Sequence, residues 1–89
     1  MRNNDAVSNT TINSVVFGKS NQESNGNNNL LSGTTNQNTG GISNLISGSN
    51  NDVTTATDTV VFGKSNTITN GNNNIISGLS QTINDSSNN

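Results

Sequence analysis

Pairs of aliphatic residues recur along this chain at a constant spacing, separated by stretches rich in Asn, Ser, Thr and Gly. Each pair is followed by one further residue and a glycine, as in SVVFG, NLLSG, NLISG, TVVFG and NIISG, and successive phrases begin 15 residues apart. The five glycines are Gly18, Gly33, Gly48, Gly63 and Gly78. A fixed period this short indicates one small structural unit stacked on itself.

Each 15-residue unit divides into halves of eight and seven residues, because a small residue stands eight positions after each glycine. Halves of this length are too short for helices and fit a strand of four or five residues plus a tight turn. Val and Ile favour the strands, and Asn, Gly and Ser favour the turns. The pattern therefore predicts an all-β fold, a narrow two-sheet parallel β-solenoid (β-roll) with 15-residue rungs, about five to six rungs spaced about 4.8 Å apart. The five glycines are expected at its corners, where positive φ or a missing Cβ is needed.

Superposing the two halves on their small closing residues predicts which aliphatic column is buried. The predicted core consists of Val15, Leu30, Leu45, Val60 and Ile75, with Val53, Ile68 and Ile83 from the second half. The predicted outward row, an assembly face, consists of Val16, Leu31, Ile46, Val61 and Ile76. The alternative places the column of Val16 in the core and the column of Val15 on the outside. An aliphatic stripe is exposed under either assignment, and such a stripe is typical of an interaction surface.

Asparagines also recur in columns. Identical Asn side chains stacked at strand spacing can form amide ladders, each amide donating to one neighbour and accepting from the other. The best candidate ladder consists of Asn21, Asn36, Asn51 and Asn66. A second candidate, Asn29, Asn44 and Asn74, is interrupted by Thr59. The alternative is that these residues are solvated turn residues.

A slower period of 45 residues, or three rungs, overlies the first. The phrase VVFGKSN at 15–21 recurs at 60–66, which predicts two superunits, 15–59 and 60–89. We expect the solenoid over 12–84, preceded by a partly ordered segment 1–11 and followed by a polar tail 85–89. Uncapped solenoid ends expose strand edges that pair with other chains, so we expect end-to-end stacking. The alternatives are termini that cover the ends, and local β-hairpins at Asn25-Gly26 and Asn70-Gly71.

Composition narrows the function classes. Apolar residues make up 25% of the 89, and Asn, Ser and Thr supply 47 positions, which alone would suit a disordered segment. The strict glycine period argues against disorder. A net charge of −2 and two aromatic residues favour no nucleic-acid partner. Cys and His are absent, and no apolar run is long enough for membrane insertion.

The candidate chemical motifs are weak, so we expect no enzyme, cofactor, metal site or small-molecule substrate. Gly18-Lys19-Ser20 and Gly63-Lys64-Ser65 echo the end of a phosphate-binding loop. Asn13 and Asp58 stand where that loop needs its first glycine, and no helix is expected to follow. The five carboxylates fall in five different columns, which argues against an acid–base pair.

The phrases NSVVFGKSN, NLLSG and TITNGNNNIISG, over roughly residues 12–84, resemble the YadA-like head repeats of trimeric autotransporter adhesins. The resemblance implies a left-handed β-roll, self-association and an adhesive role at the cell surface. The expected function is a structural protein that polymerises into fibres through its ends and its aliphatic face, with itself as partner. The alternative is an adhesin or fibre head module that forms a side-by-side trimer and binds a surface or host ligand. The resemblance implies a cell-surface role, and the expected location is extracellular or at the cell surface, although the N-terminus lacks the hydrophobic stretch of a signal peptide.

Overall fold

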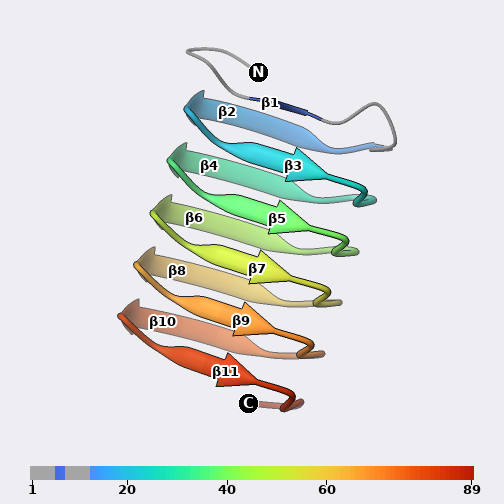
Figure 1. Ribbon diagram of the computed structural model, residues 1–89, viewed down its shortest axis with the longest axis vertical. Coiled ribbons are helices and arrows are strands. Elements are labelled where there is room, and N and C mark those ends of the chain that lie inside the picture. Colours follow the sequence, from blue (N-terminus) through green and yellow to red (C-terminus); the bar gives the residue numbers. More distant parts are fainter. Residues whose placement is uncertain (1–5, 8–12) are drawn as a thin grey trace.

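Two stacks of parallel strands wind around a common axis in this protein (Figure 1). The computed structural model describes residues 6–7 and 13–89. The long strands, five residues each, are β2 (Val15–Lys19), β4 (Leu30–Thr34), β6 (Leu45–Ser49), β8 (Val60–Lys64) and β10 (Ile75–Leu79). The short strands are β1 (Ala6–Val7), β3 (Gln22–Ser24), β5 (Gln37–Thr39), β7 (Asp52–Thr54), β9 (Thr67–Thr69) and β11 (Thr82–Asn84). The predicted all-β parallel solenoid is confirmed.

The register follows the sequence period. Long strands pair in the order β10-β8-β6-β4-β2 and short strands in the order β1-β3-β5-β7-β9-β11. Within the long-strand sheet each residue lies beside the residue 15 positions away, as Gly18 does beside Gly33. Every described pairing is parallel, which excludes the local hairpins, since a hairpin requires antiparallel strands.

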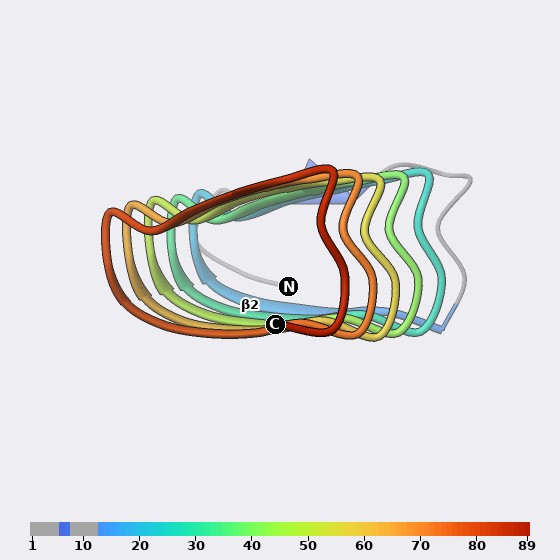
Figure 2. The same cartoon turned by 90° about the horizontal axis from the view of Figure 1, so that it is seen from below.

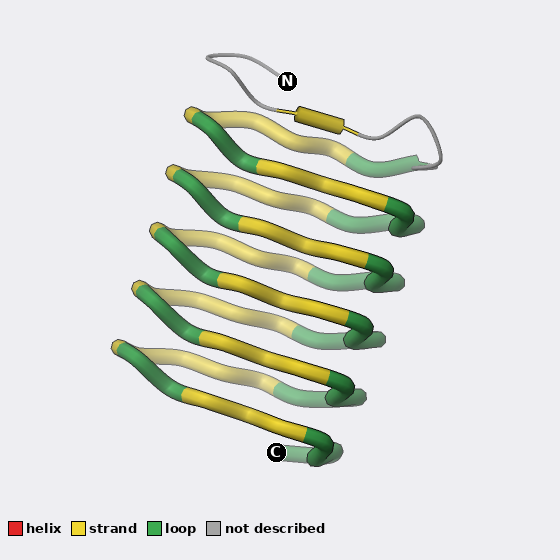
Figure 3. Tube along the Cα trace, viewed as in Figure 1, coloured by secondary structure: helices red, strands yellow, loops and turns green. Residues whose placement is uncertain are grey.

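Each rung has three sides, where the sequence predicted two. A third side carries isolated parallel bridges that join Asn27, Ile42, Thr57, Asn72 and Ser87 in turn. Figure 2 looks along the stack and shows two long sides closed by this shorter one. The loops between the strands are drawn in green in Figure 3.

The rungs turn at residues with left-handed backbone, and these residues, not the glycines, mark the corners. In the first complete rung they are Ser20, Asn25 and Asn28, with φ of 59°, 56° and 57°. Short polar side chains tolerate this conformation better than others. Equivalent positions in later rungs are mostly Asn, Ser, Thr and Asp.

The five glycines predicted as corners lie instead at the fourth position of the long strands, so that prediction is wrong. Gly18, Gly33, Gly48, Gly63 and Gly78 have φ between 120° and 134°. A Cβ on Gly18 would overlap the carbonyl oxygen of Gly33 in the next rung. Glycine is therefore required both by the backbone angle and by the close approach of successive rungs.

The core assignment of the long strands is also reversed. Val16, Leu31, Ile46, Val61 and Ile76, predicted as the assembly face, are all buried. Val15, Leu30, Leu45, Val60 and Ile75, predicted as core, point outward, and the exposed fraction reaches 54% at Val15 and 70% at Ile75.

The two long-strand columns were assigned the wrong way round because the two halves of the unit were superposed on their small closing residues. The left-handed corners are the correct reference. Side chains alternate in direction along a strand, so the number of residues between a strand position and its corner decides whether that side chain points inward. Val16 lies four residues before Ser20, as buried Asn21 lies four before Asn25. Gly26, which served as the reference in the second half, instead follows its corner residue.

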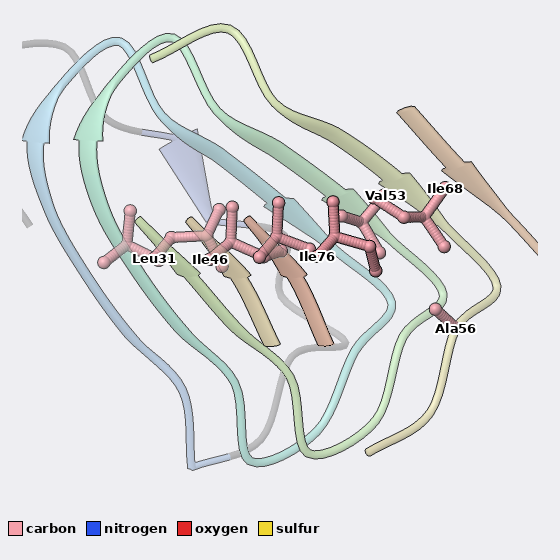
Figure 4. Close-up of a cluster of buried hydrophobic side chains, with 8 residues drawn as sticks. Leu31, Ile46, Val53, Ala56, Ile68 and Ile76 are labelled. Atoms are coloured by element: carbon pink, nitrogen blue, oxygen red, sulfur yellow. The ribbon is translucent and has the colours of Figure 1, made fainter. Parts of the chain in front are cut away.

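The predicted second-half core is confirmed at Val53 and Ile68, which are fully buried, while Ile83 is partly buried against the same cluster. Figure 4 shows Val53 and Ile68 with Leu31, Ile46 and Ile76 between the strands, and Ala56 apart from them. The core thus combines an aliphatic column from each of the two sheets.

The solenoid extends beyond its predicted limits of 12–84. The Asn89 amide donates to the Asn74 side-chain oxygen (2.8 Å), and its carbonyl accepts from Ile75 (2.7 Å), so 85–89 continue the last rung rather than forming a tail. At the other end β1 pairs with β3. The rest of the predicted N-terminal segment 1–11 lies outside the described residues.

Candidate functional site

The most regular feature of the interior is the predicted asparagine ladder, which is present and fully buried. It consists of Asn21, Asn36, Asn51 and Asn66, directly after the first corner of each rung. The Asn51 side-chain NH₂ donates to the Asn36 side-chain oxygen (3.0 Å) and to the carbonyls of Ser47 (3.3 Å) and Gly63 (3.0 Å). The side-chain amides of Asn36, Asn51 and Asn66 therefore each join their own strand to the rungs on both sides.

The ladder oxygens are also used. The Asn36 side-chain oxygen accepts from the backbone amide of Asn51 (3.1 Å) as well as from its side chain. At the last rung Gln81 continues the column, and its backbone amide donates to the Asn66 side-chain oxygen (2.8 Å). Buried amides cost free energy unless they are hydrogen-bonded, and the column satisfies them by stacking.

The second ladder follows the third corner, and it is built differently. Its side-chain oxygens accept from the backbone of the next rung: Asn44 donates to Asn29 (2.8 Å), and Thr59 donates to Asn44 (3.0 Å). The side-chain NH₂ groups bond instead across the rung or to a carbonyl of the next rung, as Asn44 does to Ala56 (2.9 Å). The residues predicted for this ladder are buried, and so is Thr59, which interrupts it.

A buried carboxylate lies beside the second ladder, and the sequence reasoning missed it. Glu23 is fully buried and accepts from the side-chain NH₂ groups of Asn29 (2.8 Å) and Asn38 (2.9 Å). Burial raises the pKa of Glu23 above its ordinary value, and the two amide donors act in the opposite direction. The signal was present in the sequence, because Glu23 shares the column of Asn38, Val53 and Ile68.

The outward face of the long-strand sheet carries the exposed aliphatic stripe. The stripe consists of Val15, Leu30, Leu45, Val60 and Ile75; Val15 and Ile75 at its two ends are exposed, and the three residues between them are half-buried. Phe17 and Phe62 are each 44% exposed in the next outward column, and Leu79 is exposed at the end of β10. An aliphatic column therefore faces outward as expected, but it is the other column, and only its ends are fully exposed.

The fold does not build a binding site from the two Gly-Lys-Ser phrases. Lys19 and Lys64 end strands, and the following Ser20 and Ser65 are left-handed corners, with no helix among the described elements. Residues 6–7 and 13–89 contain no group of three or more His, Cys, Asp or Glu that could hold a metal ion. Within the same residues there is no pocket. A helix long and apolar enough to cross a membrane is also not found in this part of the chain.

Comparison with known proteins adds no assignment: neither a family nor a curated protein matches this sequence.

Proposed function

We propose that this protein is a structural, self-assembling β-solenoid that polymerises into fibres by adding rungs of further copies at the ends of its stack. Its partner in this function is itself. The main support is that successive rungs bind each other through one repeated set of contacts. The same contacts serve whether the next rung belongs to this chain or to another.

Support comes from the backbone at the start of each short strand. The amide of this residue donates to the backbone carbonyl of the ladder residue one rung on. The bonds run from Gln22 to Asn36, Gln37 to Asn51, Asp52 to Asn66 and Thr67 to Gln81, each 2.8 Å. Thr82 is the equivalent residue of the last rung, so its amide is directed to where the backbone of a further rung would lie. An unpaired strand edge of this kind favours pairing with another chain.

The 45-residue period supports the same arrangement. Phe17 and Lys19 recur as Phe62 and Lys64 three rungs later, at equivalent positions of β2 and β8. A copy stacked in register after the last rung would continue both the 15-residue columns and this slower pattern. Stacking would then extend the core, the ladders and the outer face together.

The test is electron microscopy and fibre diffraction of the purified 89-residue chain. We expect filaments above a threshold concentration, with a meridional spacing of about 4.8 Å. The variant Thr82→Pro removes the outward amide without removing a bond inside the rung, and Pro is tolerated at a strand edge. Thr82→Val keeps the amide and is the matched control.

Thr82→Pro should prevent elongation while leaving the circular dichroism spectrum of the dilute protein unchanged, and Thr82→Val should still form filaments. A wild-type chain that stays folded and monomeric at all concentrations would overturn the proposal. Filaments of Thr82→Pro as abundant as those of the wild type would overturn this mode of stacking.

The second candidate is a head module that associates side by side as a trimer and binds a surface or host ligand. It is favoured by the exposed aliphatic stripe along one sheet and by the resemblance to YadA-like head repeats, which implies left-handed coiling. A discrete trimer by light scattering, constant over a wide concentration range, would support this candidate against fibre growth.

A further inference from the structure

We propose that the outward face of the long-strand sheet binds the same face of a second copy, with the two solenoids side by side and running in opposite directions. A two-fold axis along the middle strand, β6, relates the two copies. The proposal rests on the proposed self-assembly and specifies how two stacks associate, because end-to-end stacking does not use this face.

The face has three outward columns, from the first, third and fifth residues of each long strand. The first column is the aliphatic stripe. The central column contains Phe17, Ser32, Ser47, Phe62 and Ser77. The last column contains Lys19, Thr34, Ser49, Lys64 and Leu79. Successive rungs lie over one another in nearly the same orientation (Figure 2), so the face is flat enough to pack along its whole length.

The two-fold axis along β6 preserves the direction of the strands and reverses the order of the rungs. β2 therefore faces β10 of the other copy, β4 faces β8 and β6 faces itself, and each column meets the same column. The aliphatic stripe packs against the aliphatic stripe over all five strands. The opposed pairs are Val15 with Ile75, Leu30 with Val60, and Leu45 with Leu45. Val15 and Ile75, the most exposed residues of the stripe, are then covered.

The central column is complementary to itself in size under this rotation. Phe17 faces Ser77 of the other copy, and Phe62 faces Ser32. The two rings, each 44% exposed in the single chain, thus project toward small side chains that leave room for them. Ser47 faces its own counterpart on the axis.

The last column carries both lysines of the face, and the rotation keeps them apart. Lys19 faces Leu79 of the other copy, and Lys64 faces Thr34. A shift of one rung in one direction would bring Lys19 opposite Lys64, and like charges at a contact disfavour that pairing. A shift in the other direction leaves β2 uncovered. Charge and overlap therefore favour the same register, with all five strands paired.

A copy running in the same direction makes a poorer contact. A two-fold axis along the stack sets the first outward column against the last, so the stripe would meet Lys19, Thr34, Ser49 and Lys64. Aliphatic side chains would then cover ammonium and hydroxyl groups without offering them a hydrogen-bond partner. Opposite directions are favoured because apolar area then meets apolar area.

The size of the face ties lateral pairing to stacking. Five strands about 4.8 Å apart and about 17 Å long give a face of roughly 400 Å² per chain. A stable interface needs about 800 Å² from each partner. One chain therefore pairs weakly, whereas two stacked copies present about the required area, so filaments should pair where single chains do not.

Chemical cross-linking tests the direction of pairing. The chain has no cysteine, so Leu30→Cys, Val60→Cys and Ser47→Cys each introduce a unique thiol. Facing sheets pack about 10 Å apart, within reach of a short bis-maleimide. Ser47 faces itself whether the copies run in the same or in opposite directions, so Ser47→Cys reports contact between the faces. Leu30 faces Val60 only when the copies run in opposite directions.

We expect a dimer on a denaturing gel from Ser47→Cys alone and from the mixture of Leu30→Cys with Val60→Cys. Leu30→Cys alone and Val60→Cys alone should stay monomeric, because their counterparts lie two rungs apart across the interface. A dimer from Ser47→Cys without one from the mixture would overturn the opposite directions.

A pair of charge variants tests the register. Thr34→Asp places a carboxylate opposite Lys64 of the other copy and should raise the share of double-width filaments in electron micrographs. Ser49→Asp is the matched variant, because it also puts a carboxylate beside a lysine of its own chain. It faces the same carboxylate of the other copy, however, and should abolish the pairing. A change of the same sign in both variants would overturn the register.

The outcomes separate this proposal from the proposed function. Double-width filaments that cross-link through Ser47→Cys and through the mixture support both. Single-width filaments without cross-links overturn the lateral pairing and leave the stacking intact. Cross-linked dimers without filaments support the lateral pairing and overturn the stacking.

Discussion

Two regions of the interior use the same column of the short-strand sheet in opposite ways. In the N-terminal region the column holds Glu23 and Asn38, and in the C-terminal region it holds Val53, Ile68 and Ile83. The backbone register is the same in both. The first region is therefore held by directed hydrogen bonds and the second by apolar packing.

In the polar region the buried side chains are hydrogen-bonded to one another. Glu23 accepts from Asn38, and Asn38 accepts from Asn44 (3.2 Å). Gly26 and Gly41 separate the partners, because a Cβ at either position would overlap the bonded groups. The polar column thus depends on glycine at the neighbouring inward position.

The apolar region begins with a coupled change. Val53 replaces the amide of the column, Ala56 replaces the glycine, and Thr59 replaces the asparagine of the second ladder, all in one rung. Ala56 is fully buried, and Thr59 turns its hydroxyl to the Thr57 carbonyl (3.2 Å). In the next rung Gly71 and Asn74 return together beside Ile68. The comparison teaches that the glycine and the asparagine of the second ladder change as a pair, because a Cβ at the glycine would overlap the asparagine amide, whereas the short-strand column changes separately.

Ile68→Asn should have the largest effect, because the NH₂ group of the new amide lies between Val53 and Ile83, neither of which offers an acceptor, and only its oxygen can bond, to Asn74. Lost apolar burial and an unsatisfied polar group together should lower the free energy of unfolding by about 4 kcal/mol. Urea denaturation followed by circular dichroism measures the change. Thr67→Asn, at the exposed neighbour in β9, should stay within about 0.5 kcal/mol of the wild type. Equal losses in the two variants would contradict the apolar assignment.

Asn38→Val should cost somewhat less, about 3 kcal/mol, because it leaves the buried Glu23 with one donor and removes the acceptor of Asn44. The double variant Glu23→Leu with Asn38→Val should recover part of this loss, since replacing both partners removes the unpaired charge. A double-mutant cycle from urea midpoints gives the coupling. Additive losses would show that the two side chains act independently.

Thr59→Asn should destabilise by about 2 kcal/mol, because the new amide would meet the Cβ of Ala56, as a Cβ at Gly41 would meet Asn44. Adding Ala56→Gly should restore stability close to the wild-type level by recreating the arrangement of the preceding rung. Thermal unfolding of the four proteins in this cycle measures the rescue. A double variant less stable than Thr59→Asn alone would refute the coupling.

Glu23→Gln should have the smallest effect at neutral pH, where the wild type should be no more stable than the variant. The pKa of Glu23 is raised in the fold, so the folded state binds a proton more tightly than the unfolded state. The stability contributed by the protonated group is complete below the ordinary value of 4.5 and is lost as pH rises through the raised pKa. Stability of the wild type relative to Glu23→Gln should therefore fall with rising pH. The opposite slope in urea titrations would contradict the burial of Glu23.

The sequence predicted the fold and the first ladder because both depend on period alone. A parallel stack repeats every contact at the rung length, so identical residues at 15-residue spacing must lie beside each other. The columns of Asn21 and Val53 could thus be assigned without coordinates. Their burial, like the choice between the columns of Val15 and Val16, depends on where the chain turns.

The sequence by itself determined the columns of this protein, their spacing and the presence of an exposed aliphatic stripe. The tertiary structure decided which stripe is exposed, the third side of each rung and the burial of Glu23. The physical reason is that period fixes which residues are neighbours along the stack, whereas left-handed corners such as Ser20 and Asn25 fix which way each side chain points. Those corners are made by several polar residue types, so no single letter marks them in the sequence.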